Sequence, residues 1–452
     1  MVSIRNFYKN STILISGGTG FLGQILLEKT LRLLQPSKVY LLIRKKKGLD
    51  AEQRLHKMMA GIVFDRVRSL STLPKVEAIE VDMTRPDMAL SAETRRQLEQ
   101  EVDAVFQLAA SVSFNESLQT SLRENVQNNL NLYNLVRDMK NLRVAMQVST
   151  MYSNCNREVI EEKVYNDVGF GGYDAIVKML NQLHETQKEA ITPYILKGLP
   201  NTYTFAKKCV EIKLQQEFSH LPVGIFRPPA ITSTYKEPLV AWIDNMYGAG
   251  GYVLPMILGL YSAYFLDNAT VPMFAPVDYC ANALLLSAFD VANSFHTGRN
   301  VIPVYNYADK SCPNFQDTYN YFVEGLPWLQ RSIYRHFMNT RTTNESRYRF
   351  AVALMLAHAS AMDRLRIMTG QTPGIRRAVE RALQMMDKSR LLMVTNWEIE
   401  NANIKRIQQS LDPVERKLFE CDLGTVNWRQ HFADFIPGLR KHVLNGRKNN
   451  SR

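Results

Sequence analysis

Short apolar runs alternate with amphipathic stretches up to about residue 230. Runs rich in β-branched and aliphatic side chains predict buried strands at 12–16, 39–43, 76–81, 104–108, 144–148 and 223–226. Apolar positions three or four residues apart predict helices at 21–34 and 117–139. Strands that alternate with helices in this way predict an α/β protein with a Rossmann-like, doubly wound parallel sheet.

The second half of the chain has a different pattern. Residues 236–330 are richer in Gly, Pro and aromatic residues and show weak periodicity, which favours an irregular substrate-binding subdomain. Beyond residue 330, apolar positions at helical spacing predict helices at 348–368, 374–386 and 401–409. We therefore predict three domains, a Rossmann domain at 1–235, the subdomain at 236–330 and a mainly helical C-terminal domain at 331–452.

The formal net charge of +12 is concentrated in the predicted C-terminal domain, which holds twice as many Lys and Arg as Asp and Glu. This domain lacks the zinc-ligand spacings and the aromatic motif of common nucleic-acid-binding modules, so we expect no nucleic-acid partner. Its cations favour anionic ligands or an anionic membrane surface, with a solvated helical face as the alternative. The apolar runs 252–266 and 350–362 are shorter than the roughly 20 residues of a membrane span, and we expect buried or interfacial helices there.

Cysteine usage and the N-terminal segment limit the compartment. The five cysteines form no C-x-x-C pair and have no His at ligand spacing, so we expect neither a metal site nor a disulfide framework. The N-terminal residues contain no apolar segment of a secretory signal. We expect a protein that faces the cytosol and is not secreted.

The strongest motif is a glycine loop directly after the predicted strand at 12–16. Gly17, Gly20 and Gly23 form G-x-x-G-x-x-G and open the following helix. Such glycines permit a tight turn, close approach of a pyrophosphate and packing of helix on strand, while the helix N-terminus attracts the phosphates. The loop predicts dinucleotide binding, in which Thr19, Phe21 and Leu22 take part.

The end of the second strand distinguishes NADPH from NADH. A carboxylate there would bind the ribose 2′-hydroxyl of NADH, but the strand is followed by Arg44 and the lysines 45–47. We predict that Arg44 pairs with a 2′-phosphate and that the cofactor is NADPH. Later strand ends add candidate contacts to the adenine and to the path between adenosine and nicotinamide, namely Asp82, Met83, Ala109 and Ala110.

A second motif supplies an acid. Tyr203 and Lys207 are four residues apart, on one face of a helix. An ammonium near a phenol stabilises the phenolate and lowers the tyrosine pKa, and the same lysine can hold the nicotinamide ribose. Ser149 and Thr150 follow a predicted strand, and either hydroxyl can donate to a carbonyl oxygen that becomes an oxyanion.

Together these motifs resemble the extended short-chain dehydrogenase/reductases, and within them the alcohol-forming fatty acyl-CoA reductases of the insect type. The matching stretches are Ile15–Gly23, Ala109–Glu116, Val148–Cys155, Asn201–Lys207, Arg227-Pro228, Trp242–Asn245, Pro276–Asp278, Phe419–Asp422, Asn427-Trp428 and Gly438–Arg440. The resemblance implies Tyr203 as proton donor, Lys207 as its partner and Thr150 or Ser149 as carbonyl anchor. It further implies reduction of a long-chain acyl-CoA by two NADPH, through a hemithioacetal and an aldehyde, to a primary alcohol and CoA.

The sequence departs from this family at two places. Gln107 stands where the family has a histidine, and Asn128-Asn129 stands where the family has Gly-Thr. Two alternatives therefore stay open: another extended dehydrogenase, such as a sterol dehydrogenase or sugar-nucleotide epimerase, or a catalytically weak, NADPH-binding scaffold on a membrane. The resemblance favours the cytosolic side of the endoplasmic reticulum or peroxisome, and it predicts neither acyl chain length nor oligomeric state.

Overall fold

The chain forms two compact units in a computed structural model that describes residues 3–260, 262–296, 298, 300–336 and 339–444. Unit 1 comprises Met1–Pro229, Val277–Ala308 and Glu398–Asp422. Unit 2 comprises Ala230–Pro276, Asp309–Trp397 and Leu423–Arg452. These two units are defined by their compactness. The predicted domain boundaries at residues 235 and 330 are based on composition, and the assignment of 236–330 as a substrate-binding subdomain stays a prediction.

Unit 1 is built on a parallel sheet of seven strands in the order β11-β7-β5-β4-β1-β2-β3. The order runs outward in both directions from β1 and β4, which is the switch point at which doubly wound proteins bind ligands. Strands β1, β4, β5 and β7 are buried at every position, so their sequences read as continuous apolar runs. The strands are β1 Thr12–Ser16, β2 Lys38–Ile43, β3 Lys75–Glu80, β4 Ala104–Gln107, β5 Val144–Val148, β7 Val223–Arg227 and β11 Val304–Asn306.

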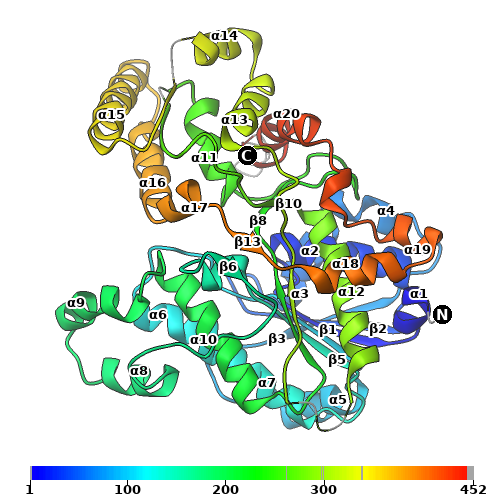
Figure 1. Ribbon diagram of the computed structural model, residues 1–452. Coiled ribbons are helices and arrows are strands. Elements are labelled where there is room, and N and C mark those ends of the chain that lie inside the picture. The colour runs from blue at the N-terminus through cyan, green and yellow to red at the C-terminus, as the bar shows by residue number, and fades with distance from the viewer. Residues whose placement is uncertain (1–2, 261, 297, 299, 337–338, 445–452) are drawn as a thin grey trace. The chain divides into compact units, whose positions relative to one another are not determined.

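Two groups of helices flank the sheet (Figure 1). Helix α12 packs on α2, β5 and β7, while α10 packs on α6 and α7. The predicted helix at 21–34 is α2 Phe21–Lys29 continued by a π-helical turn, Thr30–Leu34. The predicted helix at 117–139 is α6 Leu118–Leu122, a π-helical turn at Arg123–Gln127 and α7 Asn128–Asp138. The remaining elements of unit 1 are α1 Ile4–Tyr8, α3 Ala51–Met59, α4 Asp65–Arg68, α5 Ala92–Glu101, α8 Tyr173–Leu180, α9 Glu185–Leu196, α10 Thr202–Glu217, α12 Val277–Ser294, α18 Ala402–Ser410, α19 Pro413–Leu418, the short 3₁₀ turns Ile62–Phe64 and Met151–Asn154, and the paired strands β6 Val159–Ile160 and β13 Glu398–Ile399.

Residues 277–294 and 304–306 are regular, although the composition of 236–330 favours an irregular subdomain. They contain α12, which covers the sheet, and β11, which extends it beside β7. Helix α12 is buried along nearly its whole length, so apolar residues surround it and no single-faced periodicity marks it as a helix.

Unit 2 is mainly helical around small parallel strand pairs. Helix α15 packs on α16 and β9, and Met355 and Ala359 form a core there with Leu260, Val379 and Leu383. The predicted helices at 348–368 and 374–386 are confirmed within three residues. Its elements are β8 Ala230–Thr232, α11 Ala249–Ile257, β9 Ser262–Phe265, β10 Phe274–Pro276, α13 Phe315–Glu324, α14 Trp328–His336, β12 Asn339–Thr342, α15 Glu345–Met368, α16 Ile375–Asp387, α17 Arg390–Val394, a 3₁₀ turn at Leu423–Thr425, α20 Trp428–Leu439 and a π-helical turn at Arg440–Leu444.

The apolar run 252–266 is not one helix. Its first part lies in α11, which ends at Ile257, and its last part is the strand β9 paired with β12. Among the described residues, no helix is both long enough and apolar enough to cross a membrane.

Candidate active site

The glycine loop packs tightly against the end of a neighbouring strand. Gly17 has a φ of +80°, and a Cβ on it would lie 2.6 Å from the backbone nitrogen of Ala109, just after β4. A Cβ on Gly23 would lie 2.3 Å from the carbonyl oxygen of Gly17. Neither contact leaves room for a side chain, so both glycines are required for the loop to lie on the sheet. Ala109 and Ala110, both half-buried, are thereby beside the loop.

The N-terminus of α2 is open to an anion. Its N-cap is Gly20, and within the described part of the chain no side chain caps the helix or places a carboxylate in its first turn. The first backbone N–H groups of a helix have no partner in the helix itself, and the helix dipole attracts negative charge to them. Thr19 and Phe21 are half-buried at this end, and Leu22 is buried beneath it.

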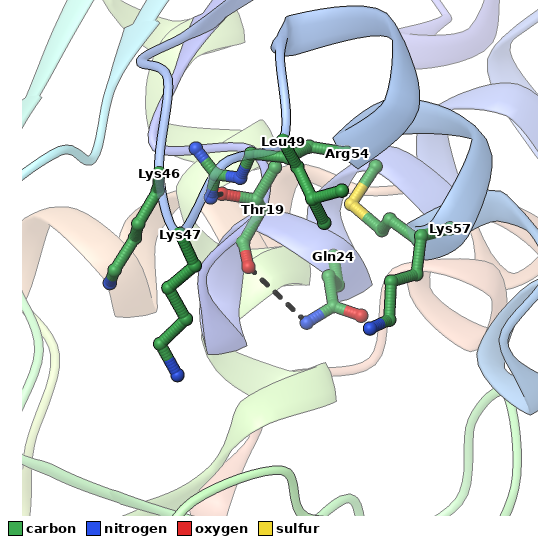
Figure 2. A pocket seen from close by; sticks show the side chains of 8 residues that line it. Thr19, Gln24, Lys46, Lys47, Leu49, Arg54 and Lys57 are labelled. Atoms are coloured by element: carbon green, nitrogen blue, oxygen red, sulfur yellow. Dashed lines mark hydrogen bonds between the residues drawn. The ribbon is translucent and has the colours of Figure 1, made fainter. Parts of the chain in front are cut away.

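A basic pocket of about 330 Å³ adjoins the loop. Lys46 and Lys47 enter it from the turn after β2, and Arg54 and Lys57 enter it from α3 (Figure 2). Arg54 is held in place, because its Nη2 donates to Thr19 Oγ1 at 3.1 Å and its Nη1 donates to a backbone carbonyl. Among the described residues no carboxylate lines the pocket; the lining residues are Thr19, Gln24, Lys46, Lys47, Leu49, Arg54, Lys57 and Met58.

The cations of this pocket repel one another. Partial burial lowers the pKa of Lys46, and the charges of Arg44, Arg54 and Lys47 lower it further. Burial and then the charge of Arg44 likewise lower the pKa of Arg54. An anion bound here would relieve this repulsion.

The structure puts Arg44 beside the pocket, not in its lining. The side chain is exposed, and its carbonyl accepts the hydrogen bond from Arg54. Sequence reasoning missed Arg54 and Lys57. The signal that could have found them is Asp50 followed three residues later by Gln53, a capping box that starts α3 and directs its first turns toward the glycine loop.

Asp82 and Met83 follow β3 at the same edge of the sheet. Asp82 is exposed, and hydrogen bonds from the hydroxyl and backbone N–H of Thr84 lower its pKa. The Met83 carbonyl accepts a hydrogen bond from Asn131 on α7. The Asp82 carboxylate is therefore engaged in hydrogen bonds within its own turn.

Tyr203 and Lys207 lie on the first two turns of α10. The Asn201 side chain caps this helix by accepting the Thr204 N–H at 2.9 Å. Lys207 is 2% exposed, and its Nζ donates to the carbonyl oxygen of Val148 at 2.8 Å and lies 6.0 Å from the centre of the Tyr203 ring. Burial lowers the pKa of Lys207 to about 8, opposed by the charge of Glu211.

The ionisation of Tyr203 differs from the sequence-based expectation. Burial raises the pKa of its phenol, and the neighbouring ammonium does not offset this rise. The phenol is therefore held in its proton-bearing form, which a proton donor requires.

Ser149 and Thr150 follow β5 and have different partners. The Ser149 hydroxyl donates to Glu211, which also forms a buried bidentate ion pair with Arg227, its Oε2 lying 2.6 Å from Nη2. The Thr150 hydroxyl accepts the N–H of Tyr152 at 3.3 Å and donates to no group among the described residues. The Thr150 hydroxyl can therefore donate a hydrogen bond to a ligand, whereas the Ser149 hydroxyl already donates to Glu211.

Comparison with known proteins assigns the chain to a family. Models described as "Male sterility protein" match an NAD-binding region at residues 15–284 and a further region at residues 354–446. The chain is 31% identical to fatty acyl-CoA reductase wat of Drosophila melanogaster over 98% of its own length and 86% of that protein. It is also 31% identical to human fatty acyl-CoA reductase 1, over 98% and 87%.

The chain belongs to the fatty acyl-CoA reductase family. It is an oxidoreductase with a nicotinamide-cofactor domain. Solved structures show the fold: the terminal reductase domain of the myxalamid pathway has a TM-score of 0.63 at 17% identity and covers 96% of this chain and 91% of its own. A Mycobacterium tuberculosis reductase domain of a nonribosomal peptide synthetase scores 0.60 at 17% identity and covers 96% and 92%.

The two departures of this reductase from the family pattern contact each other. Gln107 Nε2 donates to Asn129 Oδ1 at 2.7 Å and lies 3.2 Å from the carbonyl oxygen of Ala109. Asn129 in turn donates to the carbonyl of Asn125, whose Oδ1 accepts the N–H of Ser111. The pair therefore braces the segment after β4 on which the glycine loop packs.

Proposed function

We propose that this reductase converts long-chain acyl-CoA to a primary alcohol with release of CoA, using two NADPH. One observation carries the proposal: Thr150, Tyr203 and Lys207 lie at the ends of β5 and α10, in a chain similar to named fatty acyl-CoA reductases over almost its whole length. The free proton of Thr150, the neutral phenol and the buried ammonium are the groups that carbonyl reduction requires.

The residues present fit a dinucleotide, and they favour NADPH over NADH. Gly17 and Gly23 form a cradle that a Cβ would fill, and the open N-terminus of α2 suits a pyrophosphate. Arg54, Lys46, Lys47 and Lys57 supply positive charge to a 2′-phosphate where NADH enzymes place a carboxylate. Arg44, the adenine contacts at Asp82 and Met83 and the path at Ala109-Ala110 stay predictions about the same cofactor.

The protein's part in each reduction is to hold the carbonyl oxygen and move one proton. NADPH, when bound, would supply the hydride to the carbonyl carbon. The Thr150 hydroxyl and the Tyr203 phenol both donate to the carbonyl oxygen, where negative charge develops, and Tyr203 then transfers its proton to that oxygen. Lys207 stabilises the phenolate that remains and offers a donor to the nicotinamide ribose.

Two such reductions complete the reaction. The first converts the thioester to a hemithioacetal, whose C–S bond then breaks to leave an aldehyde and CoA thiol. The second reduction adds a hydride and a proton to the aldehyde and forms the primary alcohol.

We place this reaction on the cytosolic side of an intracellular membrane, the endoplasmic reticulum or the peroxisome. The long acyl chain of substrate and product supports this placement, because each buried CH₂ contributes about 0.8 kcal/mol to partition into lipid. The basic, helical composition of residues 331–452 supports it as well.

Product analysis tests the reaction. Purified protein supplied with NADPH and acyl-CoA of several chain lengths should oxidise two NADPH for each CoA released and yield the alcohol. Tyr203→Phe should reduce turnover by about 10²- to 10⁴-fold, because the proton is lost while the glycine loop is intact. The variant should keep its protection by NADPH against thermal unfolding. Absence of CoA release at every chain length would refute the proposal.

A further inference from the structure

Helix α15 of unit 2 exposes a continuous apolar face. Phe350 is 68% exposed, Leu354 47%, Leu365 54% and Met368 83%. Together with the exposed Ala357 and Ala361, these residues are spaced three or four apart and line one side of the helix. We call this side the α15 outer face.

The opposite side of α15 is already buried. Tyr348, Ala351, Met355 and Ala359 face the interior, against β9 and α16. A helix on the surface of a protein ordinarily presents charged and polar residues on its outward side. No described residue covers the α15 outer face, and exposed apolar surfaces of this kind mark sites of contact with another molecule.

The charges of α15 are sorted around this face. At 3.6 residues per turn, Arg347 and Arg364 project within about 60° of Phe350, near the two ends of the face. The acidic residues Glu345 and Asp363 project about 140° away from it. Apolar side chains thus share one side with Arg347 and Arg364, whereas the two carboxylates and Arg366 project toward the other side and Arg349 projects between the two.

The two carboxylates are also engaged. Glu345 pairs with Arg349 and Arg390. Asp363 accepts the backbone N–H groups of Gly374, Ile375 and Arg376 at the start of α16.

Several arginines of α15 and α16 are not neutralised. Arg376 pairs with Glu380 on its own helix. No ion pair is found within the described chain for four exposed arginines, which are Arg347, Arg364, Arg377 and Arg381. Of these four, Arg347 and Arg364 lie on the apolar side of α15, and unpaired cations beside apolar side chains match the chemistry of an anionic lipid surface, where acyl chains meet phosphate groups.

We propose that the α15 outer face binds an anionic membrane surface, with the helix lying in the plane of the interface. The apolar side chains enter the boundary between headgroups and acyl chains, and the long stems of Arg347 and Arg364 reach back to the phosphates. The helix, about 36 Å long at 1.5 Å per residue, gives one extended line of contact. This contact lies at the membrane surface, and it does not depend on the proposed reaction.

Charge favours lipid over a second copy of the chain. A symmetric contact between two such faces brings the same cations together and offers them no carboxylate, which disfavours association. An anionic bilayer supplies the opposite charge at the depth where the arginines lie.

Sedimentation with vesicles tests the proposal on the full chain. The protein should bind vesicles of phosphatidylcholine and phosphatidylserine at 70:30 (roughly the anionic content at which basic surfaces bind) more tightly than vesicles of phosphatidylcholine alone, and high salt should weaken the difference. The double substitution Leu354→Glu and Leu365→Glu should lower partition to the anionic vesicles by about tenfold or more, since it puts carboxylates on the face. Arg347→Gln with Arg364→Gln should lower only the preference for phosphatidylserine.

Matched controls separate the outcomes. Tyr194→Glu changes a 75% exposed apolar residue of unit 1 and should leave vesicle binding unchanged. Thermal melts report on folding, and turnover of a water-soluble, short-chain acyl-CoA reports on the proposed reaction. Both should be unchanged in the variant that combines Leu354→Glu and Leu365→Glu. If its melt shifts, Phe350→Ser with Met368→Ser serves as the milder replacement.

Three results overturn the proposal. In the first, the parent protein binds no vesicle. In the second, the variant with Leu354→Glu and Leu365→Glu is folded and binds vesicles like the parent. In the third, the parent is a dimer and this variant is a monomer. The last would assign the face to self-association. A parent protein that binds vesicles as expected but turns over no acyl-CoA would count against the proposed reaction alone.

Discussion

Two groups of cations near the candidate active site of unit 1 differ in their access to water. Lys207 is buried and held by the Val148 carbonyl, and burial brings its pKa to about 8. Lys46 and Lys47 are exposed around an open pocket in which the cations repel one another. The Lys207 ammonium is held by a hydrogen bond and excluded from water, whereas the lysines of the open pocket are accessible to solvent and to an entering anion. A precise catalytic role fits the first group, and cofactor selection fits the second.

The largest expected difference concerns the two hydroxyls beside the buried lysine. Thr150→Val should lower kcat by about 10²- to 10³-fold, because it removes a donor to the developing oxyanion. Ser149→Ala should lower kcat by less than about tenfold, since that hydroxyl is committed to Glu211. Steady-state rates with a fixed acyl-CoA measure both. The reverse ranking would make Ser149 the carbonyl anchor.

An intermediate effect concerns pH. If the Lys207 ammonium is needed, activity should fall as pH rises through about 8, the pKa of Lys207. Glu211→Gln should move this alkaline limb to lower pH, because the Glu211 charge raises that pKa. Glu217→Gln, near the far end of the same helix, should leave the limb in place.

Stability should follow pH in the opposite sense over the same region. Folded Lys207 has a pKa below the ordinary value of 10.5, so between about pH 8 and 10.5 the unfolded chain binds the extra proton. The contribution of Lys207 to the free energy of unfolding should therefore rise across this window and be lost as pH falls through about 8. In the activity experiment, if neither Glu211→Gln nor Glu217→Gln loses activity as pH rises through about 8, the ionisation of Lys207 does not control the reaction.

The smallest effect is expected in the open pocket. Arg54→Gln should raise the KM for NADPH by about tenfold, equivalent to about 1.4 kcal/mol, and leave the KM for NADH nearly unchanged. Neighbouring lysines can still reach a phosphate, which limits the loss. Arg96→Gln, an exposed arginine of α5 that bonds within its own helix, is the matched control. An equal loss with both cofactors would mean that Arg54 serves the loop and not the 2′-phosphate.

Local patterns predicted most of the sheet, because buried parallel strands are continuous apolar runs whatever surrounds them. They missed β11, which is three residues long, and α12, which is apolar on every side. The glycine loop and the Tyr203–Lys207 pair were predictable for the same reason: a tight turn and a helical spacing are properties of neighbouring residues.

The sequence by itself determined the Rossmann sheet, the loop and the residues able to carry the chemistry. Only the tertiary structure decided which of them are available. Glu211 lies far from Ser149 in sequence and accepts the hydrogen bond of the Ser149 hydroxyl, which leaves Thr150 to donate. Arg54 reaches Thr19 across a helix and a turn, and Gln107 meets Asn129 between a strand and a helix. Hydrogen bonds of this kind depend on where separate elements pack, and the side-chain pattern of one element does not contain that information.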